Sequence, residues 1–125
     1  MTLKERVLEF LKQQGFCPNV DPDGEVIFKY QMRTFVNYYA EDDEEFFQLV
    51  MPAIFEVTDD NRDVVLEAAN KVNVTMKVVK CVILGDSVWV LYEDFVSQDT
   101  DMSDVIPLAL NILQNAQQRF YQEVK

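Results

Sequence analysis

Acidic side chains are the groups that this sequence offers most freely for chemistry, whereas histidine is absent. With 22 aspartate and glutamate residues, two carboxylates could meet at the separation of about 5–9 Å that glycoside hydrolysis uses. Without an imidazole, however, no Ser-His-Asp or Cys-His pair can form, and no zinc site that contains histidine. We therefore expect no catalytic residue and keep a carboxylate-dependent hydrolase only as the least favoured alternative.

Metal and nucleotide sites are likewise not predicted. Asp99, Asp101 and Ser103 have the spacing of the first three ligands of an EF-hand loop. The loop then fails, because Asp104 replaces its glycine and Leu110 replaces its bidentate glutamate. None of the three glycines belongs to a phosphate-binding GxxxxGK or GxGxxG loop. The sequence therefore indicates no metal ion and no cofactor.

The two cysteines, Cys17 and Cys81, lie far apart without CxxC spacing, and each has apolar neighbours in the sequence. This pattern predicts two buried, reduced thiols and neither a disulfide nor a metal pair. Such thiols should react slowly in the folded protein.

Charge narrows the range of partners. The 11 basic and 22 acidic residues give a net charge of −11, and this field repels the phosphates of nucleic acids and anionic lipid surfaces. The charged N-terminal residues lack the apolar region of a signal peptide, and no apolar run approaches the roughly 20 residues of a membrane helix. We therefore expect an acidic, cytoplasmic protein that binds neither nucleic acid nor membrane.

Three segments have the hydrophobic period of amphipathic helices. They are Thr2–Gln14, a segment around residues 64–72, and a C-terminal stretch that continues to Phe120. Thr2 and Glu5 have capping-box spacing at the start of the first helix. Asp101 or Ser103 can cap the third.

Five further segments are rich in β-branched and aromatic residues, as strands are. They are Glu25–Tyr30, Arg33–Ala40, Glu45–Phe55, Met76–Leu84 and Ser87–Tyr92. Gly85-Asp86, between the last two, suits a two-residue type II′ hairpin. Pro52 predicts a bulge or an edge position, because proline cannot donate to a strand ladder. The acidic run at residues 41–45 should be a solvated loop.

The order of these elements, α-β-β-β-α-β-β-α, predicts the fold class. Short connections between strands favour an antiparallel sheet, so the chain should be an α+β protein in which a five-stranded, twisted antiparallel sheet packs with three helices. Residues 1–125 contain no linker, repeat or low-complexity tract, and their number is typical of a single domain.

The strands carry more apolar residues than one buried face needs. A sheet with helices on one face should alternate apolar and polar side chains, yet Met76–Leu84 is apolar on both sides except at Lys77 and Lys80. Either the helices divide between the two faces, or an apolar surface is left for a partner such as a second copy of the chain. The residues that we select for this dimer or partner surface are Ala68, Ala69, Val72, Val78, Val82, Leu84 and Trp89.

The chain also resembles the YbjN-like family of bacterial sensory transduction regulators, from about Thr2 to Tyr121. The resemblance rests on the element order and on three motifs, which are Asp23-Gly24-Glu25, the pair Asn70 and Asn73, and the hairpin Leu84-Gly85-Asp86-Ser87-Val88. It implies a fold similar to that of class I type III secretion chaperones, which are small, acidic, non-catalytic and often dimeric, and which bind an unfolded stretch of a secreted protein. By that analogy the dimer would use the second helix and the strand after it, at residues 64–84.

Besides the least favoured hydrolase, two classes of function remain. The favoured hypothesis is a non-catalytic homodimer that binds a protein or peptide, as an adaptor, a regulator or a chaperone-like module. The alternative is a small-molecule sensor with an aromatic pocket between the third helix and the sheet. An uncovered apolar face would favour the first hypothesis, and a concave pocket with convergent polar groups would favour the second.

Overall fold

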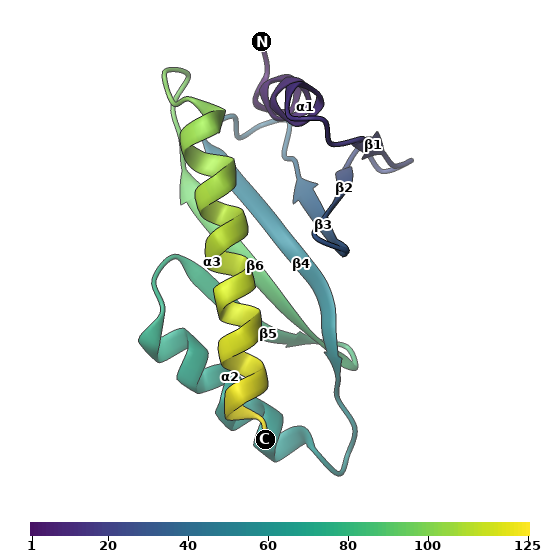
Figure 1. The fold of residues 1–125 in the computed structure, drawn as a ribbon, viewed down its shortest axis with the longest axis vertical. Coiled ribbons are helices and arrows are strands. Elements are labelled where there is room, and N and C mark those ends of the chain that lie inside the picture. The colour runs from purple at the N-terminus through teal and green to yellow at the C-terminus, as the bar shows by residue number, and fades with distance from the viewer.

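A computed structural model describes all of residues 1–125 as three helices and one antiparallel sheet of six strands in the order β1-β2-β3-β4-β6-β5. The helices are α1 (Leu3–Gln13), α2 (Arg62–Thr75) and α3 (Met102–Glu123). The strands are β1 (Asn19–Val20), β2 (Val26–Tyr30), β3 (Arg33–Tyr38), β4 (Phe46–Glu56), β5 (Val79–Leu84) and β6 (Ser87–Phe95). Figure 1 shows α3 running along β4 and β6, with α2 beside β5 and α1 at the opposite end of the molecule.

The α+β class, the three helices and the antiparallel sheet are confirmed, but the expectation of five strands is wrong because β1 adds a sixth. β1 has only two residues, which pair with β2 as Asn19↔Ile27 and Val20↔Val26. Both of its side chains are exposed. The segment therefore has no apolar alternation by which the sequence could reveal it.

Local sequence signals set the helix starts. Thr2 and Glu5 form the predicted capping box of α1, in which the Thr2 hydroxyl accepts from the Glu5 N–H at 3.1 Å. Of the two candidate caps of α3, Asp101 is the N-cap, and its carboxylate accepts the Ser103 N–H at 2.9 Å. The acidic loop before β4 is largely exposed as predicted, but Glu44 in it is half-buried and accepts the Leu3 N–H at 2.9 Å.

The two predicted irregularities of the sheet are both present. Leu84 pairs with Ser87 around the Gly85-Asp86 turn, and of its two residues only Gly85 has a positive φ, at 65°, as a type II′ hairpin requires. In β4 the register against β6 shifts between Met51 and Phe55. This bulge contains Pro52, which lacks an N–H for the ladder.

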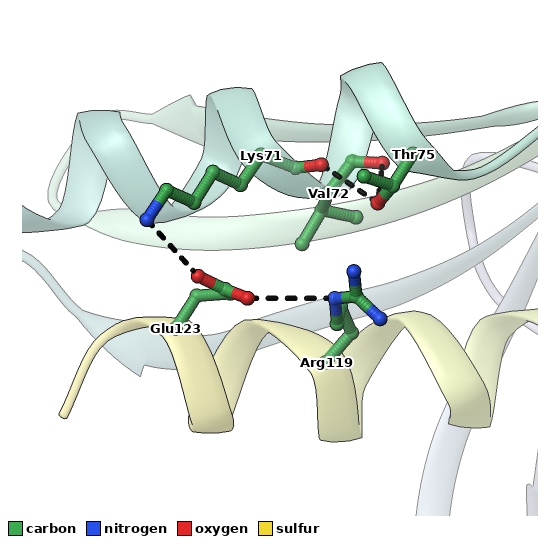
Figure 2. A network of polar contacts seen from close by, with 5 residues as sticks. All are labelled: Lys71, Val72, Thr75, Arg119 and Glu123. Carbon is green, nitrogen blue, oxygen red and sulfur yellow. Dashed lines mark hydrogen bonds and ion pairs between the residues drawn. The ribbon is translucent and has the colours of Figure 1, made fainter.

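The core lies on one face of the sheet. A single cluster of 28 buried residues contains the apolar faces of all three helices together with one parity of strand residues, such as Phe47, Val90 and Tyr92. Helices α2 and α3, which meet above this core, are also joined by an ion pair between the Lys71 Nζ and Glu123, at 3.4 Å. Glu123 forms a second ion pair within α3, to the Arg119 Nε at 3.5 Å, as Figure 2 shows. The helices therefore cover one face of the sheet and do not divide between two.

The two cysteines lie in different environments. Both thiols are free, and Cys81 is buried as predicted, but the predicted burial of Cys17 is wrong because its side chain is exposed. Cys17 lies in the connection between α1 and β1, after the turn at Gln14 and Gly15. Phe16 of the same connection packs against the core, whereas the adjacent Cys17 side chain is left in solvent, so apolar neighbours in the sequence do not bury a residue there.

Candidate functional site

The face of the sheet opposite the helices, here called the far face, carries an apolar row. Strand register places Ile27 opposite Val36, Val36 opposite Val50, and Val50 opposite Leu91, so four apolar side chains cross β2, β3, β4 and β6 in line. Lys80 of β5 ends this row. The other apolar and aromatic residues of the far face are Tyr38, Phe46, Val82, Leu84, Trp89 and Phe95.

The far face is covered only by its own side chains. Val36 and Val50 are buried, Val50 completely, yet neither belongs to the core cluster under the helices. Around them Ile27, Trp89 and Leu91 are half-buried. Leu84 is 49% exposed and Phe95 is 80% exposed, at opposite ends of the face. A solvated sheet face normally carries polar residues, so this one has the composition of a contact surface.

The strand positions of the far face carry balanced charge, and two further acids, Glu25 and Asp21, lie near its Tyr38. The strand positions themselves carry two acids, Glu56 and Glu93, and two bases, Lys29 and Lys80. Lys80 forms an ion pair with Glu93, and the other Glu93 oxygen accepts from the Gln48 Nε2 at 2.7 Å. Since the whole chain carries 22 acids, most of the negative charge lies on other surfaces.

Comparison with known protein families shows to which family the chain belongs. The model of the YbjN family, described as "Putative bacterial sensory transduction regulator", matches residues 3–124. The chain belongs to the YbjN family. That description is of a regulator and not of an enzyme, and it agrees with a surface suited to binding. Among curated proteins, none matches this sequence.

In this YbjN-family chain the residues selected from the sequence separate into two groups. Ala68, Ala69 and Val72 of α2 are buried in the core, so they support the helix and cannot contact a partner directly. Val82, Leu84 and Trp89 lie together on the far face, where Val82 is opposite Trp89. The remaining residue, Val78, is exposed just before β5 and has a positive φ of 56°.

Sequence reasoning missed the centre of the far face. Val36, Val50 and Leu91 were not selected, although the apolar character of both parities of β4 and β6 was a signal for them. Which parity faces the helices depends on packing, and a one-residue change of register would exchange the two faces.

The free edge of β5 is closed by a side chain. The Asn73 Nδ2 donates to the Cys81 carbonyl at 2.9 Å, and the Cys81 N–H donates to the Asn73 Oδ1 at 2.7 Å. The carboxamide thus bonds Cys81 as the peptide group of a further strand would. This gives a structural role to one of the asparagines that mark the family resemblance, and it blunts an edge that could otherwise pair with another chain.

Two potentially reactive side chains beneath these surfaces, Cys81 and Tyr92, are buried. No three His, Cys, Asp or Glu side chains converge as a metal ion would need. Burial raises the pKa of the Cys81 thiol to about 12, and burial together with Asp94 raises the pKa of Tyr92 to about 12. Both groups are therefore neutral near pH 7 and poorly suited to act as nucleophile or base. None of the helices combines the length and apolar character that crossing a bilayer demands.

Proposed function

We propose that this YbjN-family protein is a non-catalytic regulatory module that acts by binding protein, and that its far face joins two copies of the chain. The observation that supports the proposal is the apolar row Ile27–Val36–Val50–Leu91, which no helix covers. Two sheets that pack through these faces would direct their helices outward. The helical surfaces would then stay free for a partner polypeptide.

The size of the far face is compatible with such a dimer. Five strands spaced about 4.8 Å apart, with usable lengths of about 25 Å, give a footprint of roughly 600 Å² on each copy. The total of about 1,200 Å² lies at the lower limit for specific interfaces. We therefore expect a dissociation constant in the micromolar range, because association entropy offsets much of the apolar gain.

The local charge of the far face permits a second copy of the chain as the occupant, although the net charge opposes it. Two whole chains repel each other because each carries −11, but the strand positions of the far face hold as many bases as acids, so local repulsion between two such faces would be small. The residual repulsion acts over longer distances and is screened by salt. The dimer should therefore become tighter as ionic strength rises.

The test is sedimentation velocity across a concentration series, at low and at physiological salt. Leu84→Glu and Val82→Asp place a carboxylate on the far face and should shift the protein to monomer. Leu108→Glu is the matched control, because Leu108 is 51% exposed and Leu84 is 49% exposed, but Leu108 lies on α3. A wild-type protein that stays monomeric at several hundred micromolar would refute the dimer. Equal weakening by Leu84→Glu and Leu108→Glu would refute the far face as its interface.

A further inference from the structure

A polar cleft lies between α3 and the β2–β3 hairpin, on the helix side of the sheet. It has a volume of about 410 Å³ and is lined by Gln31, Arg33 and a polar face of α3 that extends from Asn111 to Tyr121. A smaller hollow of about 230 Å³ adjoins it at the Pro52-Ala53 bulge, and Arg33 and Gln117 line both. The cleft does not belong to the far face.

Gln117 brings an unused acceptor to this cleft. Its side chain is only 4% exposed, and its Nε2 donates to the Tyr121 hydroxyl at 3.0 Å. The Tyr121 hydroxyl gives its single proton to the Ile54 carbonyl at 2.8 Å, so it must accept from Gln117, and this fixes which way the amide points. The Gln117 Oε1 therefore accepts no hydrogen bond within the protein. Since no fully enclosed side-chain oxygen lacks a partner, this oxygen opens into the hollows that Gln117 lines.

Arg33 supplies the only charge in the cleft. No carboxylate lines either hollow, although the chain has 22 acids. The Arg33 guanidinium takes part in none of the three ion pairs of the protein. It is thus an unpaired planar donor, with the geometry that binds a carboxylate through two hydrogen bonds.

The rest of the lining is made of amides. Asn111, Gln114, Asn115 and Gln118 of α3 can each donate and accept, and hydroxyl groups match such side chains because they also do both. The Gln114 Nε2 donates to the Gln31 Oε1 at 2.8 Å, which links the hairpin to the helix across the cleft. The hairpin turn at Gln31 and Met32 has positive φ values of 49° and 65° without glycine.

We propose that this cleft binds a small polyhydroxylated carboxylate, a sugar acid in chemical class. The carboxylate pairs with Arg33, one hydroxyl donates to the Gln117 Oε1, and the others bond the amides of α3. A single cation without a second one nearby selects a monocarboxylate, and the absence of acids leaves no group to repel it at close range. The site gives the regulator a small-molecule input that does not depend on the dimer.

The test uses D-gluconate and D-glucuronate as probes and is read by NMR, from the side-chain signals of Arg33 and the glutamine amides. D-Glucose supplies hydroxyls without the acid, and acetate supplies the acid without hydroxyls. The measurements are made near physiological salt, where distant charges are screened. At least one sugar acid should bind about tenfold or more tightly than glucose and acetate. Arg33→Gln should remove that advantage, because hydrogen bonds to a charged group are stronger than neutral ones.

Two further variants separate the site from general effects. Gln117→Leu removes the unused acceptor and should weaken sugar-acid binding severalfold. Arg119→Gln changes the same residue type as Arg33 on the same helix as Gln117, but outside the cleft, and should leave the affinity unchanged. The proposal is overturned if neither sugar acid perturbs the cleft signals at about 10 mM, if acetate or glucose binds as well as the sugar acids, or if Arg119→Gln weakens binding as much as Arg33→Gln.

Discussion

Replacement of Asn73 by alanine tests whether a side chain closes the edge of the sheet. The change deletes the two hydrogen bonds to Cys81, at 2.9 and 2.7 Å, and a neutral hydrogen bond contributes about 1 kcal/mol net. Alanine is a better helix former than asparagine, and this gain in helix propensity offsets about half of the free energy of one such hydrogen bond. We expect the free energy of unfolding to fall by about 1–2 kcal/mol relative to a control with the same gain in helix propensity.

Asn70→Ala is that control. Asn70 lies on the same helix and is also exposed. Its side chain takes no part in the hydrogen bonds that join α2 to β5, which both belong to Asn73. Urea unfolding compares the two variants, and hydrogen exchange at the Cys81 amide reports the edge directly. If Asn73→Ala is as stable as Asn70→Ala and the Cys81 amide exchanges at the wild-type rate, the carboxamide does not protect the strand.

Three other predictions concern single groups. The Tyr39 hydroxyl and the Leu3 N–H hold the pKa of Glu44 below its ordinary value, so its stabilisation is present at neutral pH and is lost as pH falls. Wild type should therefore lose more stability than Glu44→Gln between about pH 7 and pH 3 in urea titrations. Cys17 should react with a thiol reagent in the native state, and Cys81 only after unfolding, because burial raises the pKa of Cys81 to about 12. Gly85→Ala should lower the free energy of unfolding by about 1–2 kcal/mol, measured as a lower melting temperature, because φ at this position is 65°. The cost arises from the backbone conformation alone, since no atom lies within 4 Å of the added Cβ.

The regular elements could be predicted because each follows from local chemistry. The Thr2–Glu5 capping box, the Gly85 turn and Pro52 act through neighbouring backbone atoms, so their positions in the sequence were sufficient. The errors arose where the signal is not local. β1 is held by pairing with β2 alone. The strand predicted from Met76 begins only at Val79, because Val78 has a positive φ that the hydrophobic pattern of the sequence does not reveal.

The candidate surface was predicted only in part, for a reason that concerns α2. Ala68, Ala69 and Val72 have small side chains that suit close contact, and the sequence does not say with which neighbour. In the structure that neighbour is the chain's own core. Val82 and Trp89, which were also selected for this surface, lie outside the core because their strands are apolar at both parities while the helices cover only one face.

The long β4 has a consequence for how the protein is made. Its first half pairs with β3 through Gln48, Leu49 and Val50, but the residues after Met51 pair only with β6, where Phe55 meets Val88 and Glu56 meets Ser87. During translation that half of β4 must wait for roughly 40 further residues, which takes about 2–8 s at cellular elongation rates of about 5–20 residues per second. During these seconds the edge of β4 that later binds β6 is unpaired and open to incorrect pairing with another strand. Pro52, which offers no N–H, and the bulge around it make that edge a poor template while the nascent chain waits.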